Sequence, residues 1–423
     1  MRIALPGLWL VLGSVLTLPA QAQAQVDRIR ADVAWLADDR LGGRKAGSPE
    51  GDTAAAWIGR RFAELGLAQA PGLQGWLQPF TISPDAPAVH GTDLGGKSGR
   101  NVVAILLGRD PALRDQYVVL GAHYDHLGWG GPGSLDPDSV GVPHNGADDN
   151  ASGVAALLEV ARRLTLARPG RSVVFIAFTG EELGLLGSTH YIRNPVVPND
   201  QVVAMINFDM VGRLRDNRLV AYGVETAAEF RGLLDSLNAR AGFALTAQGG
   251  GYGPSDHTAF TIVRRPVLHF FTGTHPDYHR TTDDADKVNP QGIERIAAFA
   301  AELTGAIGNR GGSLTFVEST PPAAPSGSSR TSGYGAYLGS VPDMTGNPGG
   351  VLLSGVRPGS PAEQAGIKAG DVVVRIGTHE VPDLQAMTDA LRAHAPGDVV
   401  EVAVRRNGEL VTMKVTLGRR GGS

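Results

Sequence analysis

Five uninterrupted apolar runs lie between residues 101 and 271, and each has the length of a β-strand. They lack the alternation of polar and apolar residues that marks a strand with one face in water. Continuous runs rich in Val, Ile and Phe are typical of strands whose sheet is covered on both faces. The runs are NVVAILL (101–107), YVVLGA (117–122), SVVFIAF (172–178), VVAMINF (202–208) and PVLHFF (266–271).

Stretches with apolar residues at helical spacing lie beside these runs, at 52–66, 154–164 and 293–307. Asp52 can cap the first helix, and Gly66 ends it. Strands that alternate with helices predict an α/β protein. We expect a mixed, mostly parallel central sheet flanked by helices.

Acidic and imidazole side chains follow the carboxyl ends of these runs. In open α/β sheets the ligand crevice lies beyond those ends, so we expect the clusters to converge on one site. The clusters, with one neighbouring tyrosine, are His123, Asp125 and His126; Glu181 and Glu182; Asp209; His275, Asp277, Tyr278 and His279; and, in NGADDNASG (145–153) before the second helix, Asp148 and Asp149.

Imidazole nitrogen and carboxylate oxygen form a ligand set suited to zinc and, less exclusively, to other divalent first-row metals. The chain has no cysteine, so a thiolate site is excluded. These donors exceed what one tetrahedral ion needs. The pattern therefore predicts a centre of two divalent metal ions that share one carboxylate.

The order HYD, GADDNASG, TGEELGLLGS, NFDMVGR and YHRTTDD resembles the co-catalytic di-zinc aminopeptidase family, whose relatives include glutamate carboxypeptidase. The resemblance covers Val26 to Gly308. It implies a sheet of the zinc-peptidase type and two bound zinc ions. In that family Asp148 would match the carboxylate shared by both metals. One metal would add His123 and Asp209, and the other would add Glu182 and His279.

The same resemblance implies three further roles. Glu181 matches the general base, which would take a proton from water and return it to the leaving amine, a service worth about 10²–10⁴ in rate. Tyr278 matches a tyrosine that helps hold the developing oxyanion, and Asp125 matches an acid that orients the His123 imidazole. The resemblance also implies a cis peptide bond between Asp148 and Asp149.

Ser255, Asp256 and His257 have the residue types of a serine-hydrolase triad, but neighbours in sequence cannot by that fact alone align as one. The chain also lacks the G-x-S-x-G elbow. Support of the metal site and a plain helix cap both remain open for this segment.

Residues 1–24 have an early Arg, an apolar run and a small-residue pattern, as a secretory signal peptide does. We expect cleavage after Ala22 or Ala24 and a periplasmic or extracellular protein without disulfides, with no membrane insertion after cleavage. An uncleaved membrane anchor is the alternative. The catalytic domain would then span 25–308.

The Ser-, Pro- and Gly-rich residues 309–333 predict a flexible linker. Residues 334–419, with SPAEQAGIKAGDVVVRIG, resemble a PDZ domain of the bacterial periplasmic protease type, a small β-rich unit. The resemblance implies a peptide C-terminus bound beside a strand, with its carboxylate on the N–H groups of the YLGS loop (337–340). A domain that only packs on the catalytic unit is equally open.

Formal net charge is −4, and no basic stripe is present, which argues against a nucleic-acid partner. We therefore predict a secreted zinc-dependent aminopeptidase acting on peptide substrates. A carboxypeptidase or dipeptidase on the same centre is the alternative, and it would need clustered arginines for a free carboxylate. A non-catalytic protein that binds peptides through its PDZ domain is a third reading. The candidate arginines are Arg213, Arg215, Arg264, Arg265 and Arg280.

Overall fold

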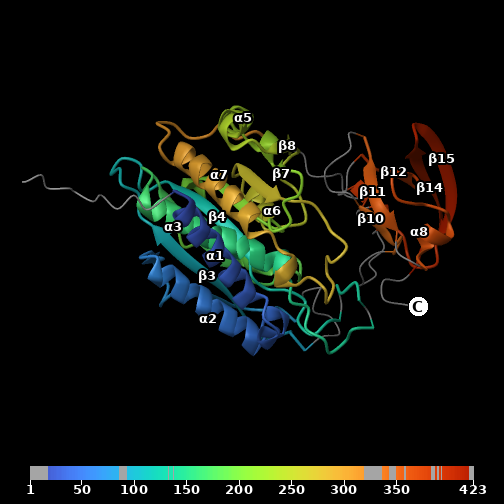
Figure 1. Ribbon diagram of the computed structural model, residues 1–423, viewed down its shortest axis with the longest axis horizontal. Helices are drawn as coiled ribbons and strands as arrows, with labels where there is room; N and C mark the ends of the chain where they lie inside the picture. The colour runs from blue at the N-terminus through green and yellow to red at the C-terminus, as the bar shows by residue number, and fades with distance from the viewer. Residues whose placement is uncertain are drawn as a thin grey trace, which may run out of the picture.

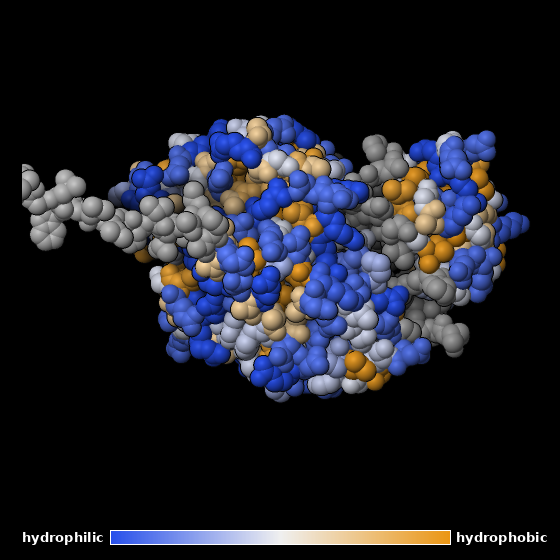
Figure 2. All heavy atoms as spheres, in the orientation of Figure 1, coloured by the Kyte–Doolittle hydropathy of each residue, from blue (hydrophilic) through white to orange (hydrophobic). Residues whose placement is uncertain are grey.

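Two separate β-sheets organise the chain (Figure 1). The computed structural model describes residues 18–84, 93–131, 133–136, 138–318, 336–342, 349–356, 359–382, 386–387, 390–391 and 393–418. Among these residues, no helix combines the length and the apolar character that a membrane span requires. The face visible in Figure 2 is mostly hydrophilic, with apolar side chains in small scattered groups.

The larger sheet has nine strands in the order β1-β3-β5-β4-β6-β9-β7-β8, with β2 paired to β3. Its four central strands, β5, β4, β6 and β9, are parallel, whereas β3 and β7 join them antiparallel. The predicted mixed sheet is thus confirmed, with its parallel part at the centre. The strands are β1 (Ala68–Gln69), β2 (Leu77–Thr81), β3 (Ser98–Leu106), β4 (Tyr117–His123), β5 (Ser172–Phe178), β6 (Val202–Phe208), β7 (Arg218–Tyr222), β8 (Ala244–Gln248) and β9 (Val267–Phe271).

Helices cover both faces of this sheet, which explains the uninterrupted apolar runs. Alternate residues of one strand enter different cores: Phe175 of β5 packs with the α1, α2, α3 and α7 side, and Ile176 packs with the α4 and α6 side. Apolar side chains therefore fill most positions on both faces, with a few buried polar exceptions such as Asn101 and Asn207. The helices are α1 (Leu18–Leu36), α2 (Pro49–Glu64), α3 (Gly153–Leu166), α4 (Leu186–Arg193), α5 (Phe230–Ala241), α6 (His257–Ile262) and α7 (Pro290–Gly308).

Helix boundaries follow capping chemistry. Ser48 accepts a hydrogen bond from the Gly51 amide, with Pro49 at the first helical position of α2. The predicted start at Asp52 was therefore wrong by one turn, because Ser48 supplies the cap and Asp52 lies inside the helix. Asn289 caps α7 in the same way, through the Gly292 amide.

Among the side chains of helix α1 that the structure describes, burial begins just after the predicted cleavage sites. Residues 22–24 are exposed, whereas Val26 is buried and is followed by buried Ile29 and Val33. Arg163 of α3 donates to the Gln25 side chain. The packed part of the helix therefore begins where the predicted signal peptide ends.

The first residues of the predicted linker contact the catalytic unit. The Val317 amide donates to Thr226, and the Thr315 amide donates to Glu229, so this segment lies against the catalytic unit. Residues 319–335 lie outside the described residues. Leu314 of this segment is also buried in the core of the catalytic unit, and the composition of the predicted linker gave no sign of these contacts.

The smaller sheet is antiparallel, in the order β10-β11-β12-β14-β15 with β13 beside β12. It has its own core, which includes Leu338, Leu353, Ile376 and Val402. Residues 383–385, 388–389 and 392 lie outside the described residues. The elements are β10 (Ser340–Pro342), β11 (Val351–Val356), α8 (Pro361–Gln364), β12 (Val372–Ile376), β13 (His379–Glu380), β14 (Val399–Arg406) and β15 (Glu409–Thr416).

Candidate metal centre

The carboxyl ends of β4, β5 and β6 bring acids and imidazoles together. His123 is the last residue of β4, Asp209 directly follows β6, and Glu181 and Glu182 follow β5 by three and four residues. Asp149 lies in the turn Ala147–Ser152, just before α3. The predicted convergence is therefore what the structure shows.

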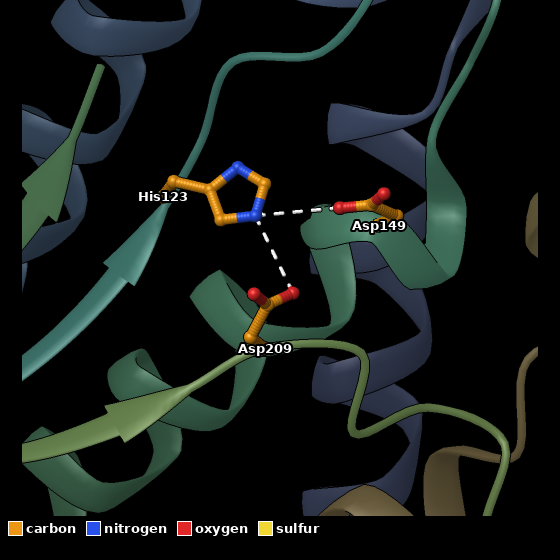
Figure 3. A group of neighbouring side chains, drawn as sticks. All are labelled: His123, Asp149 and Asp209. Carbon is orange, nitrogen blue, oxygen red and sulfur yellow. Dashed lines mark hydrogen bonds and ion pairs between the residues drawn. The ribbon is translucent and has the colours of Figure 1, made fainter. Parts of the chain in front are cut away.

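One cluster consists of His123, Asp149 and Asp209, which point toward one another from three elements (Figure 3). The His123 Nε2 atom lies 3.3 Å from Asp149 Oδ1 and 3.4 Å from Asp209 Oδ1. All three side chains are buried. One nitrogen and two carboxylate oxygens thus face a common point.

A second cluster surrounds the other oxygen of Asp149. The His279 Nε2 atom lies 3.2 Å from Asp149 Oδ2 and 3.2 Å from Glu182 Oε2. The His126 Nδ1 atom lies 2.8 Å from Glu182 Oε1 and 3.9 Å from Asp149 Oδ2. The Nδ1–H group of His279 donates to the Gly133 carbonyl at 2.9 Å, so its Nε2 atom is the one that faces the cluster.

The carboxylate shared by the two clusters is Asp149, and the expectation of Asp148 in that place was wrong by one residue. Asp148 points elsewhere: its Oδ1 atom accepts from the Gly212 amide at 2.6 Å and from Ser152 at 3.0 Å. Its Oδ2 atom lies 3.0 Å from His275 Nε2. The cis peptide bond also lies one residue later, between Asp149 and Asn150.

His126 is a site residue that the sequence-based assignment left without a role. The signal was present, because His126 lies three residues after His123 in the same strand-end loop. In the structure its Nδ1 atom joins Asp149 and Glu182 in a group that could hold a metal ion.

Asp125 contacts both His123 and the predicted base. The His123 Nδ1–H group donates to the Asp125 carbonyl at 3.2 Å, and the Asp125 carboxylate lies farther away, at 3.9 Å. That carboxylate instead accepts from the Glu181 amide at 3.3 Å. The expected contact of the Asp125 carboxylate with His123 is thus replaced by one through its main chain, and the carboxylate positions Glu181.

Burial dominates the electrostatics of the two groups predicted to act on substrate. It raises the pKa of Glu181 well above its usual range, and the neighbouring Glu182 adds to this effect. Burial likewise raises the pKa of Tyr278 well above its usual range, so the hydroxyl stays protonated. The Tyr278 ring stacks on His279 with ring centroids 3.9 Å apart.

The two clusters fit divalent cations. Burial opposes charge on both His279 and Glu182, yet their mutual attraction moves the pKa of His279 to about 10 and that of Glu182 to about 2. Buried carboxylates therefore need compensating positive charge, and without a cation it must come from protonated imidazoles. The donor atoms of His123, Asp149 and Asp209 all lie within 4.8 Å of one another, as do those of His126, Asp149 and Glu182, and both sets offer the nitrogen and oxygen ligands of zinc.

Comparison with known proteins agrees with this geometry. Residues 101–304 match the model of peptidase family M28, and residues 336–417 match the PDZ domain. The chain therefore carries an M28 peptidase domain followed by a PDZ domain. This confirms the family resemblance over the matched residues.

Three relatives illustrate the match. Leupeptin-inactivating enzyme 1 of Streptomyces exfoliatus is 29% identical over 225 residues, which are 52% of this chain and 44% of that protein. An aminopeptidase of Pseudomonas aeruginosa (strain UCBPP-PA14) is 39% identical over 114 residues, covering 26% of this chain and 18% of that one. This chain thus spans less than half the length of either curated relative. The solved aminopeptidase from Aneurinibacillus sp. strain AM-1 has a TM-score of 0.53 at 17% identity, covering 70% of this chain and 96% of its own, and so supports the fold.

The Ser255, Asp256 and His257 segment of the M28 domain does not form a triad. The Ser255 hydroxyl accepts a hydrogen bond from Asn207 at 2.8 Å. The His257 ring instead packs on His269, with centroids 4.6 Å apart. His257 begins helix α6, but the Asp256 side chain makes no capping hydrogen bond, so the helix-cap alternative is not what the structure shows.

Proposed function

We propose that the M28 domain is a secreted metal-dependent aminopeptidase that removes N-terminal residues from peptides. The observation that carries this proposal is the pair of ligand clusters that share Asp149, with Glu181 beside them but outside both. His123, Asp149 and Asp209 would hold one cation, and Asp149, Glu182 and His279 the other, with His126 in reach of the second. Two zinc ions bound there would supply Lewis-acid chemistry, polarising a carbonyl and making water more acidic.

Glu181 would act as the general base. Its pKa is raised by burial, so it accepts a proton more strongly than an exposed glutamate would at the same pH. It takes one proton from the attacking water as the oxygen bonds to the peptide carbonyl carbon. It then gives that proton to the leaving amine as the C–N bond breaks. Asp125, which accepts from the Glu181 amide, would hold this base in place.

Tyr278 would assist at the carbonyl oxygen. Its hydroxyl stays protonated because burial raises its pKa, and a protonated phenol donates a hydrogen bond to a developing oxyanion. Stacking on His279 sets the ring beside the second cluster. Tyr278 would have a supporting role, because the cations would stabilise most of the negative charge on the oxyanion.

The arginines favour an aminopeptidase over a carboxypeptidase. A free substrate carboxylate needs a guanidinium whose charge is not already paired, and three of the five candidates pair with acids. Arg213 donates to Asp283, Arg264 to Glu318 and Arg280 to Asp136. Arg215 donates to the Thr274 carbonyl, and Arg265 donates to main-chain carbonyls.

Hydrolysis of an aminoacyl chromogenic amide and of its N-acetylated form tests this choice. We expect the acetylated form to react on the order of 10²-fold more slowly. Acetylation removes the positive charge of the substrate amine, which the buried acids of the site would bind. A C-terminally amidated peptide should be cleaved as well as the free acid. Equal rates for the free and acetylated amides would rule out an aminopeptidase.

Secretion predicts a defined mature N-terminus. Residues 22–24 are exposed and Val26 is buried, so the core does not depend on the side chains of residues 22–24. N-terminal sequencing of protein exported by a bacterial host should therefore begin at Gln23 or Gln25. Recovery of the chain only in the cytoplasm with Met1 intact would contradict export.

We further propose that the PDZ domain binds peptide C-termini. Its strand β10, at the edge of the sheet, pairs with β11 on one side, and among the described strands no other pairs with it. An extended peptide can add beside such an edge, with its carboxylate at residues 337–340.

A further inference from the structure

We propose that Asp283 is a positioning residue for the metal centre, which fixes the shared carboxylate of Asp149 by gripping its main chain. The inference rests on the proposed metal-dependent function. Asp283 lies more than 130 residues from Asp149 in sequence, and none of the roles assigned above includes it.

The Asp283 carboxylate is fully buried beneath the turn that carries Asp149. Its Oδ2 atom accepts from the amides of both Asp148 and Asp149, at 2.9 Å and 3.0 Å. Its main-chain carbonyl accepts from the Ala147 amide at 2.9 Å. Asp283 thus accepts hydrogen bonds from three consecutive amides of the turn. The two bonds to its carboxylate are strengthened by the negative charge.

Arg213 holds the other side of the same carboxylate. Its guanidinium donates to Asp283 Oδ1 at 2.9 Å and lies 3.4 Å from Asp277 Oδ2. The Oδ2 atom of Asp283 therefore binds the turn, and its Oδ1 atom binds Arg213. These separate partners fix the rotation of the carboxylate and keep Oδ2 directed at the two amides.

A buried cation grips the residues just before this turn. The Arg44 guanidinium donates to the carbonyls of Asn145 at 2.6 Å and Gly146 at 3.0 Å. It also donates to the carbonyls of Tyr124 and Leu36. The Arg44 cation thus binds the carbonyls of the two residues before Ala147, and the Asp283 anion binds the amides of the two residues after it.

Close packing leaves this segment no room to shift. Gly146 has a φ of +53°, and a Cβ atom there would lie 2.5 Å from the His126 ring. Because Asp149 contributes an oxygen to each cluster, a small displacement of its main chain would disturb both. Partners that orient ligands in this way typically contribute about 10- to 100-fold in metal affinity.

Metal affinity of the full-length Asp283→Ala variant tests this role. Chelator competition with Zn²⁺ should show about 10- to 100-fold weaker binding than wild type, and the Co²⁺-loaded protein should show altered visible absorption. Asp371→Ala is the matched control. Asp371 is also buried, accepts the Lys368 amide at 2.9 Å and pairs with Arg406 at 2.7 Å, but it lies in the smaller sheet. That variant should keep wild-type affinity and absorption.

The outcomes separate this inference from the proposed function. A wild-type protein that binds neither Zn²⁺ nor Co²⁺ contradicts the metal centre itself. A wild type that binds them, with a folded Asp283→Ala variant of equal affinity and unchanged Co²⁺ absorption, overturns the positioning role. If Asp283→Ala does not fold, Asp283→Asn is measured against the same criterion. Asparagine keeps an acceptor for the amides but loses the charge that pairs with Arg213, so several-fold weaker binding is expected.

Discussion

Replacing Asp149 with asparagine is expected to abolish peptidase activity by removing the metals. Its two oxygens face the two clusters, at 3.3 Å from His123 Nε2 and 3.2 Å from His279 Nε2. An amide offers one oxygen and no charge, so it cannot serve both sites. Loss of several kcal/mol of Lewis-acid stabilisation corresponds to a rate lower by roughly 10³-fold or more. Metal analysis and kcat/KM of the purified variant check this.

Asp148→Asn is the matched control for that experiment. Asp148 is bonded to Gly212, Ser152 and His275 rather than to the clusters, so this variant should keep both metals. We expect urea unfolding to show a free energy of unfolding lower by about 1–3 kcal/mol, because the buried groups bonded to Asp148 lose a charged partner. The reverse pattern, with metals lost from Asp148→Asn and kept by Asp149→Asn, would restore Asp148 as the shared ligand.

Replacing Glu181 with glutamine is expected to lower kcat by about 10²–10⁴ while leaving metal content unchanged. The glutamine has nearly the same shape, and the main-chain amide that donates to Asp125 is retained. It cannot accept the water proton, however, so only the proton-transfer step is lost. Steady-state kinetics and metal analysis of the same preparation separate the two effects.

The control for this substitution is Glu225→Gln, an exposed glutamate in another loop, which should change neither quantity. Turnover of Glu181→Gln close to wild type would remove Glu181 from the chemistry. Loss of metal from that variant would instead make Glu181 a ligand.

The central strands could be predicted from the sequence because each one is marked by an apolar run within its own residues. A strand buried on both faces must be apolar throughout, and SVVFIAF became β5 with every residue buried. The same pattern did not reveal the direction of β3, because a strand covered on both faces is apolar in either direction. Strands β7 and β8 were not predicted, since they are short and lie toward one edge of the sheet.

The sequence located most of the residues that lie in the clusters, including His123, Glu182 and Asp209, but chose the wrong one of two adjacent aspartates and gave His126 no role. Which of two adjacent aspartates faces the clusters depends on contacts that are remote in sequence. The turn is held by Asp283 from one side and by Arg44 from the other. Arg44 had no distinguishing local signal, because its glycine-rich segment equally suits an exposed loop.

Anomalous diffraction at the zinc edge, from crystals of the zinc-loaded protein, would locate the bound ions relative to Asp149. We expect two peaks, one among His123, Asp149 and Asp209, and one beside Asp149, Glu182 and His279. A peak on Asp148, or no peak at this end of the sheet, would contradict this expectation.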